Sequence, residues 1–481
     1  MNDSIRIAAL SFTETRNVQG LDTILLEDRR KQHELSVYLR KRGFEVQEPL
    51  MGKCVNSRRK VVEAARDILT LEMDCVVAGC WKWTAPMLVV ELARRVNLPI
   101  MLVGDNDPKS TSLGCMAAVG AALWEVAPNE YALRHGRSLG DPDAVVDWAL
   151  GAGALTKLRR GTLLLWGGSY CLRMPHLEDD HSALKSFLVG DILTEDQYVL
   201  VKKADEFLNN RPELVDDFVK VMRERGMRFE FDGVRFTPEV LRRQAALYMA
   251  ARTRLDELRK SEEILGVSVR CQPEISEMLG VTACIIPSLL PYPEKGKRPV
   301  AAVCEGDLKG LITSVMLQLV SGLPAGFGDI RALEADGRPL LAVSNCGGAS
   351  VYYSRLAGTL EGDLPGVTMS PQCQGEAGGA VGYRSPGFGE ATVARLIRRA
   401  GEYRMQYFPA RAVEVKPEWV ERLGWGKMWP MTMFEVSWEL ADFAERVGSN
   451  HFSFVPGGHA RSLEAFCAAA GIETELIGGN F

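Results

Sequence analysis

The sequence has 481 residues, which is too long for one hydrophobic core, so we expect two or three domains. Its 46% hydrophobic and 25% charged residues are typical of a soluble globular protein, and a net charge of -5 gives no sign of nucleic-acid or membrane binding. The sequence lacks a signal-peptide pattern, an apolar run of roughly 20 residues and a CxxC pair among its 11 cysteines, so we expect reduced thiols, no membrane contact and a cytoplasmic location.

Strands and helices alternate along the first part of the chain. Apolar periodicity predicts strands at residues 5–10, 44–48, 74–79 and 99–104, and helices at residues 21–42, 57–73 and 85–96. This alternation predicts a parallel sheet with helices on both faces. A helical segment at residues 140–161 turns basic at its end, so we place the first α/β domain at residues 1–160.

A second α/β domain is predicted at residues 161–325. It begins with the apolar run 162–167, and long helical patterns fill residues 195–224 and 238–260. The apolar run 299–304 ends abruptly in Glu305-Gly306-Asp307. A helix follows, because apolar residues recur on one face at Leu308, Leu311, Ile312, Val315, Met316, Leu319 and Val320.

The pattern changes after Asp329. Short apolar runs alternate with Gly, Pro, Asp and Ser, which predicts an antiparallel barrel or sandwich. We therefore expect a β-rich C-terminal domain at residues 326–481 that carries Asp329 and His451. The predicted fold class is α/β, with two doubly wound, Rossmann-like domains followed by a β-rich, barrel-like domain.

Two acidic residues follow consecutive strand-like runs that are joined by one helix. In such a βαβ unit the carboxyl ends of the strands lie side by side, so we expect Glu305 and Asp329 to meet at a ligand-binding edge. Two neighbouring carboxylates repel each other unless a proton or a cation lies between them, which favours a metal site. The alternative is that Glu305 merely caps the helix that it precedes.

A third ligand for such a metal is expected among six histidines. A borderline cation such as Mn²⁺ accepts one imidazole beside carboxylates. His451 lies between apolar residues and could point inward from the β-rich domain, although a lone histidine there is also an ordinary core residue. His459 is the competing ligand. His176 and His181 flank an acidic run that is more typical of a solvated loop.

Several short motifs together resemble the L-fucose isomerase family. They are Arg270-Cys271-Gln272-Pro273-Glu274, Cys284, Cys304-Glu305-Gly306-Asp307, Gly328-Asp329 and Asn345-Cys346-Gly347. The tail from Asn450-His451 also resembles the end of the related L-arabinose isomerases. The resemblance implies that Glu305, Asp329 and His451 bind the metal, and it favours His451 over His459.

The resemblance also suggests residues that contact the substrate. The family carries a tryptophan that reaches into a neighbouring subunit's site, and Trp81 is our first choice for it, with Trp83 second. Gln272 stands where many relatives have an aromatic residue, and Asn345 where relatives often have a histidine. These departures leave the identity of the sugar open. The remaining predicted contacts are Ser169, Met174 and Asn450.

The activity implied by the resemblance is a metal-dependent aldose–ketose isomerase that holds Mn²⁺ and acts on an open-chain sugar. Glu305 and Asp329 would exchange acid and base roles through an ene-diol intermediate, with a hydride shift as the alternative. The family also implies a trimer or hexamer whose site is completed by a neighbouring subunit. Two other functions stay open at this point: a non-catalytic sugar-binding protein, and a metal-dependent sugar lyase or hydrolase.

Overall fold

The structure is a computed structural model that describes residues 4–16, 18–292, 299–372, 376–424, 426 and 428–478. The chain forms two compact units. The N-terminal unit comprises Asn2–Lys157 and Arg461–Ile472, and the main unit comprises Leu158–Ala460 and Glu473–Phe481. The division into three domains at residues 160 and 325 stays a prediction.

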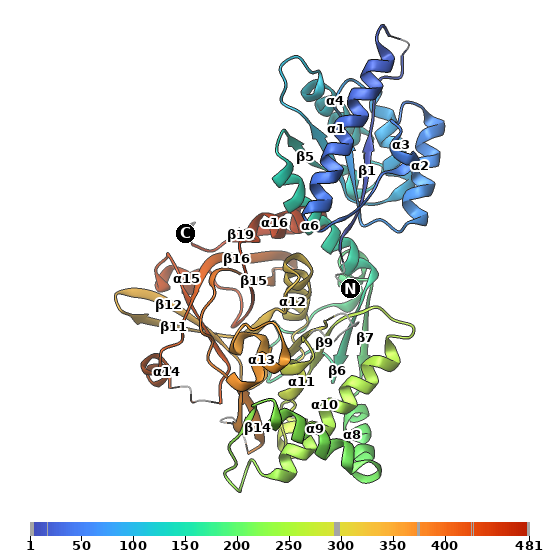
Figure 1. Ribbon diagram of the computed structural model, residues 1–481. Helices are drawn as coiled ribbons and strands as arrows, with labels where there is room; N and C mark the ends of the chain where they lie inside the picture. The colour runs from blue at the N-terminus through green and yellow to red at the C-terminus, as the bar shows by residue number, and fades with distance from the viewer. Residues whose placement is uncertain are drawn as a thin grey trace. The chain divides into compact units, whose positions relative to one another are not determined.

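The N-terminal unit is built on a parallel five-stranded sheet in the order β2-β1-β3-β4-β5. Figure 1 shows helices α1, α2, α3 and α4 around this sheet. Alternate residues of β1 pack on opposite faces: Ile7 faces the core under α1 and α6, and Leu10 faces the core under α2, α3 and α4. The sheet is therefore doubly wound, as predicted. Its elements are β1 (Arg6–Ser11), α1 (Leu21–Lys41), β2 (Glu45–Gln47), η1 (Pro49–Gly52), α2 (Arg58–Thr70), β3 (Cys75–Gly79), α3 (Pro86–Val96), β4 (Ile100–Gly104), α4 (Ser112–Val126), α5 (Glu130–Leu133), β5 (Gly136–Leu139), most of α6 (Pro142–Arg160) and most of α16 (Ala460–Ala470).

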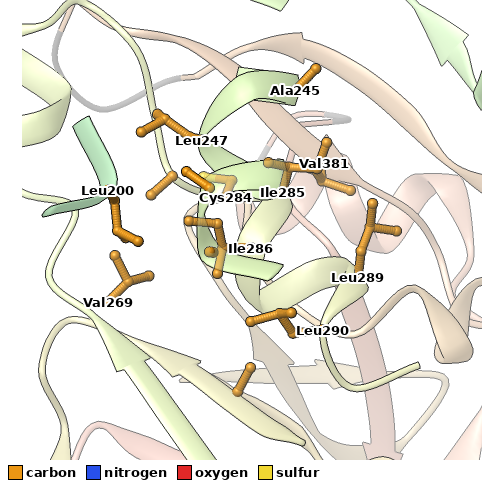
Figure 2. Close-up of a cluster of buried hydrophobic side chains, with 14 of the residues drawn as sticks. Leu200, Ala245, Leu247, Val269, Cys284, Ile285, Ile286, Leu289, Leu290 and Val381 are labelled. Atoms are coloured by element: carbon orange, nitrogen blue, oxygen red, sulfur yellow. The ribbon is translucent and has the colours of Figure 1, made fainter. Parts of the chain in front are cut away.

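The main unit begins with a second parallel sheet, in the order β10-β9-β6-β7. Side chains of α8, α10 and α11 form a large apolar cluster beside it, which Figure 2 shows around Ile286 and Leu247. A small sheet, β14-β13-β8, lies in the same unit. The elements up to this point are β6 (Thr162–Trp166), α7 (His181–Phe187), β7 (Asp191–Glu195), α8 (Tyr198–Asn210), α9 (Pro212–Glu224), β8 (Arg228–Phe229), α10 (Pro238–Leu258), β9 (Ile264–Val269), η2 (Glu274–Met278), α11 (Ile285–Leu289), β10 (Ala301–Cys304) and α12 (Leu308–Ser321).

The β-rich part of the main unit is a closed sheet. Its order is β15-β18-β11-β12-β17-β16-β19, and β15 also pairs with β16, which closes a ring and confirms the predicted barrel-like character. Its elements are β11 (Gly326–Ala335), β12 (Arg338–Ser344), η3 (Val351–Ser354), α13 (Leu360–Asp363), η4 (Leu364–Gly366), β13 (Thr368–Pro371), β14 (Gly378–Gly382), β15 (Gly389–Arg399), β16 (Glu402–Val413), α14 (Pro417–Leu423), β17 (Met431–Glu435), α15 (Leu440–Arg446), β18 (His451–Pro456) and β19 (Glu473–Leu476).

The predicted βαβ unit around α12 is wrong. β10 pairs with β9 in the parallel sheet, whereas β11 pairs antiparallel with β12 and β18 in the barrel. β11 turns back directly into β12 through Asp336-Gly337, whose φ values of 54° and 71° are typical of a tight hairpin turn. Helix α12 therefore joins two different sheets, and it packs against β9 and β10 as well as β15 and β18.

Among the helices of the described ranges, none combines the length and the apolar character needed to cross a bilayer. The cytoplasmic location stays a prediction.

The aromatic core of the barrel offers a test of how firmly β18 is held. Phe454 on β18 is buried, with its ring centroid 4.8 Å from that of Tyr353 and 5.0 Å from that of Phe434. We expect Phe454→Ala to lower the free energy of unfolding by about 3–5 kcal/mol, because it leaves a cavity between these rings. Chemical denaturation would measure this. Val234→Ala, at a side chain that is 82% exposed, is the control and should change stability by less than about 0.5 kcal/mol.

Candidate active site

Glu305 lies in a tight turn at the carboxyl end of β10. Its φ is +66°, a left-handed conformation that costs free energy for a residue other than glycine, and Gly306 follows at φ +63°. A Cβ atom on Gly306 would lie 2.5 Å from the carbonyl oxygen of Gly168, so the turn packs tightly against the loop after β6. The side chain of Glu305 is held almost entirely out of solvent, because the residue is only 8% exposed.

Asp329 and His451 come from the barrel. They are register partners on the antiparallel strands β11 and β18, so their side chains leave the sheet on the same face. The imidazole of His451 is fully buried, whereas the side chain of Asp329 is 29% exposed. Asp329 is the fourth residue of β11 and not its last, unlike the predicted placement at a strand end.

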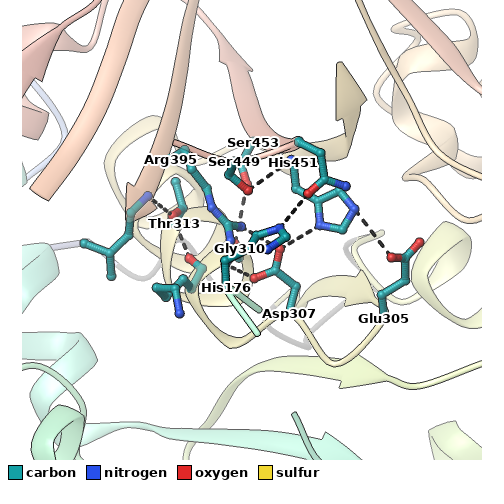
Figure 3. Close-up of polar contacts among 12 residues, drawn as sticks. His176, Glu305, Asp307, Gly310, Thr313, Arg395, Ser449, His451 and Ser453 are labelled. Atoms are coloured by element: carbon teal, nitrogen blue, oxygen red, sulfur yellow. Dashed lines mark hydrogen bonds and ion pairs between the residues drawn. The ribbon is translucent and has the colours of Figure 1, made fainter. Parts of the chain in front are cut away.

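The structure brings these three side chains together. Nε2 of His451 lies 3.4 Å from Oδ1 of Asp329. It also lies 3.5 Å from Oε2 of Glu305, a contact drawn in Figure 3. One ligand atom from each residue falls within 4.8 Å of the other two. Within the described part of the chain, Nε2 has no well-aligned hydrogen bond although it is buried. Such an imidazole nitrogen, facing two carboxylates, is a suitable ligand for a cation.

The other imidazole nitrogen is fixed by Asp307. Nδ1 of His451 lies 2.8 Å from Oδ2 of Asp307, and the same oxygen accepts a hydrogen bond of 2.5 Å from Nη1 of Arg395 on β15. Oδ1 of Asp307 accepts the backbone N–H of Gly310, so Asp307 caps α12. The alternative that Glu305 is the cap of this helix is thereby excluded.

Burial and charge shift the pKa values of these groups in different directions. Burial raises the pKa of Glu305 to about 7, although the charge of His451 opposes the shift. Burial alone would lower the pKa of His451, but the carboxylates of Asp307, Asp329 and Glu305 raise it well above its usual value. For Asp307, burial is outweighed by Arg395 and His451, and its pKa falls well below its usual range. The cluster is thus stabilised by positive charge placed among its carboxylates.

Asn450 and Met174 lie beside this cluster. Nδ2 of Asn450 donates a hydrogen bond of 2.7 Å to Oδ1 of Asp329, and its Oδ1 lies 2.8 Å from Nε2 of His176. Sδ of Met174 is 3.9 Å from Nδ2 of Asn450. Of the predicted substrate contacts, Asn450 is therefore next to Asp329, and Met174 is next to Asn450. His176, predicted to lie in a solvated loop, contacts Asn450 as well.

Gln272 and Asn345 line a small cavity together with Glu305. The amide of Asn345 is used within the protein, since Nδ2 donates to Sγ of Cys304 at 3.0 Å and Oδ1 accepts the backbone N–H of Gly348. Ser169 lies in the loop that packs on Gly306, with its Oγ 3.5 Å from Nε2 of His181. Contacts of these residues with a substrate stay predictions.

The remaining sequence-derived candidates, Trp81, Trp83 and His459, are not members of this cluster. Trp81 is 5% exposed and packs in the core under α1 and α6 of the N-terminal unit, whereas Trp83 is 39% exposed. Exposure thus favours Trp83 over Trp81 for a contact with a neighbouring subunit, and this contact stays a prediction. Nε2 of His459 lies 3.1 Å from the carbonyl oxygen of Pro456.

Sequence comparison adds one partial similarity. No family model matches the chain. A stretch of 165 residues is 27% identical to sulfoquinovose isomerase from Clostridium sp. (strain MSTE9), and it covers 34% of this chain and 34% of that protein. The chain thus matches about a third of the length of this curated relative.

The buried contacts of Asp307 generate a stability prediction. Asp307→Ala would leave Arg395 buried without its carboxylate and would remove the cap of α12, so we expect a loss of about 3–5 kcal/mol in unfolding free energy. Asp180→Ala removes the exposed cap of α7 and should cost only about 1 kcal/mol. Equal losses in the two variants, measured by chemical denaturation, would contradict this account of Asp307.

Proposed function

We propose that this protein is a metal-dependent sugar isomerase that interconverts an open-chain aldose and its ketose. The observation that carries the proposal is the convergence of Glu305, Asp329 and the unsatisfied Nε2 of His451. The partial similarity to sulfoquinovose isomerase supports a relationship to sugar isomerases in general. Membership of the L-fucose isomerase family stays a prediction.

The donor set fits a divalent cation. Two carboxylates and one imidazole suit a hard or borderline ion such as Mn²⁺. The buried Nε2 atom has no hydrogen-bonding partner among the described residues, and such an ion would be its partner. Glu305, Asp329 and His451 would hold the ion, while Asp307 fixes the imidazole through Nδ1. When bound, the ion would act as a Lewis acid that polarises the carbonyl group of the sugar.

The same carboxylates would move the proton. Glu305 and Asp329 approach Nε2 of His451 from two different sheets, so a sugar bound between them would have a carboxylate within reach on each side. One carboxylate would remove the proton next to the carbonyl and return it to the neighbouring carbon through an ene-diol intermediate. A hydride shift is the alternative, and only the ene-diol route exchanges substrate hydrogen with deuterium from the solvent.

Replacing either carboxylate should greatly slow turnover without unfolding the protein. We expect Glu305→Gln and Asp329→Asn to lower kcat by about 10²–10⁴-fold, the usual contribution of a positioned acid or base. Glu334→Gln, at an exposed position on the same strand as Asp329, is the matched control and should keep wild-type turnover. The measurement is ketose formation from a panel of aldoses with Mn²⁺-loaded protein.

The panel also tests the competing functions. It should contain L-fucose, D-arabinose, L-arabinose and, because of the partial similarity, sulfoquinovose. A non-catalytic sugar-binding protein would bind a sugar equally well in both carboxylate variants and convert none. A lyase or hydrolase would release cleaved products. Activity that survives complete removal of metal by a chelator would contradict the metal-dependent mechanism.

We also propose a homo-oligomer, a trimer or a hexamer, with no nucleic-acid or membrane partner. Exposed large apolar side chains in the N-terminal unit support self-association, and five of them come between a strand of the set β1 to β4 and the next strand. They are Leu26, Met51, Trp83, Met87 and Leu113.

Light scattering on the full chain would test this state. We expect a solution mass of three or six times 53.0 kDa. Trp83→Glu should have a smaller mass, because it places a charge among these exposed apolar side chains. A wild-type mass of 53.0 kDa would contradict the oligomer.

A further inference from the structure

Glu305 belongs to a second cluster of ligand atoms. Its Oε2 faces His451, whereas its Oε1 lies 4.0 Å from Sγ of Cys304 and 4.0 Å from Sγ of Cys346. The two sulfur atoms and the carboxylate oxygen lie within 4.8 Å of one another. Glu305 is therefore shared by two groups of ligand atoms, one with Asp329 and His451 and the other with Cys304 and Cys346.

The sulfur atoms gather from separate elements. Cys271 follows β9, Cys284 precedes α11, Cys304 ends β10 and Cys346 follows β12, and all four line the same small cavity as Glu305. All ten cysteines in the described residues are buried and unbridged. Four of them converge here from positions far apart in the chain, whereas Cys75 and Cys467 lie in the N-terminal unit.

The sulfur atom of Cys304 faces a hydrogen-bond donor. Nδ2 of Asn345 donates a hydrogen bond of 3.0 Å to Sγ of Cys304, so this sulfur acts as an acceptor. The charge of His451 faces Oε2 of Glu305, whereas Oε1 faces the two thiols. Because burying a carboxylate costs free energy unless its charge is compensated, a cation bound by the thiols would compensate the charge on the Oε1 side.

We propose that Cys304, Cys346 and Glu305 bind a thiophilic divalent cation of the Zn²⁺ or Cd²⁺ type. Sulfur ligands select such ions, whereas carboxylate and imidazole ligands suit Mn²⁺. Each thiol releases its proton to the solvent as the sulfur–metal bond forms. Because Glu305 belongs to both groups, a thiophilic ion bound by the thiols competes for the carboxylate that the proposed isomerase uses.

Titration of the chelator-treated, reduced full chain with Cd²⁺ tests this site. We expect a thiolate-to-Cd²⁺ charge-transfer absorption in the ultraviolet that saturates at about one ion per chain, as for a single structural site. Cys304→Ser and Cys346→Ser should each lose most of this absorption. Cys467→Ser, at a buried cysteine of the N-terminal unit, is the matched control and should keep it.

Two further measurements keep the result independent of folding and of the isomerase proposal. X-ray absorption on the Cd²⁺-loaded wild-type protein should show sulfur neighbours of the ion, and it needs no variant. His451→Gln should keep the absorption, because this histidine belongs only to the other group, so the thiol site can be correct even if no isomerase activity is found. An ion surrounded only by oxygen and nitrogen, or an absorption unchanged in both serine variants, would overturn the proposal.

Discussion

The buried contacts of Asp307 with Arg395 and with His451 are the interactions on which the candidate site depends. Asp307 accepts from the guanidinium group and contacts Nδ1 of the imidazole with the same oxygen, and all three side chains are almost fully buried. A buried charge is tolerated only when it is paired, so replacing any one of the three side chains would leave a buried charge without its partner. The consequence is a fixed imidazole whose remaining nitrogen points at two further carboxylates.

The contacts of Asp307 also explain how two different sheets form one site. Glu305 follows a strand of the parallel sheet, whereas Asp329 and His451 lie on strands of the barrel. Helix α12 packs against both sheets, and its cap, Asp307, is the residue that fixes His451. The position of the imidazole relative to Glu305 is therefore set by the start of one buried helix. This helix is buried along nearly its whole length, including its polar residues Lys309, Thr313 and Gln318.

The sequence predicted local features well and long-range ones poorly. Apolar periodicity correctly located α12, the alternating elements of the N-terminal unit and the change to short strands after Asp329. The βαβ prediction failed because the residues of a strand do not reveal which strands it pairs with. The Asp-Gly pair at 336–337 is typical of a hairpin turn and could have indicated that β11 pairs with β12. Asp307 was readable as a helix cap, but its pairing with Arg395 and His451 joins distant positions and has no local signature. The proximity of Glu305 and Asp329 was predicted from that βαβ unit, so it was right for a wrong reason. The choice of His451 as the third residue followed from a resemblance, since spacing alone left His459 open.

Anomalous diffraction from crystals of the full chain soaked in Mn²⁺ tests the central claim most directly. The account predicts a manganese peak bounded by Glu305, Asp329 and Nε2 of His451, with Nδ1 still in contact with Asp307. A well-occupied peak elsewhere, or an imidazole turned away from both carboxylates in the soaked crystals, would contradict it.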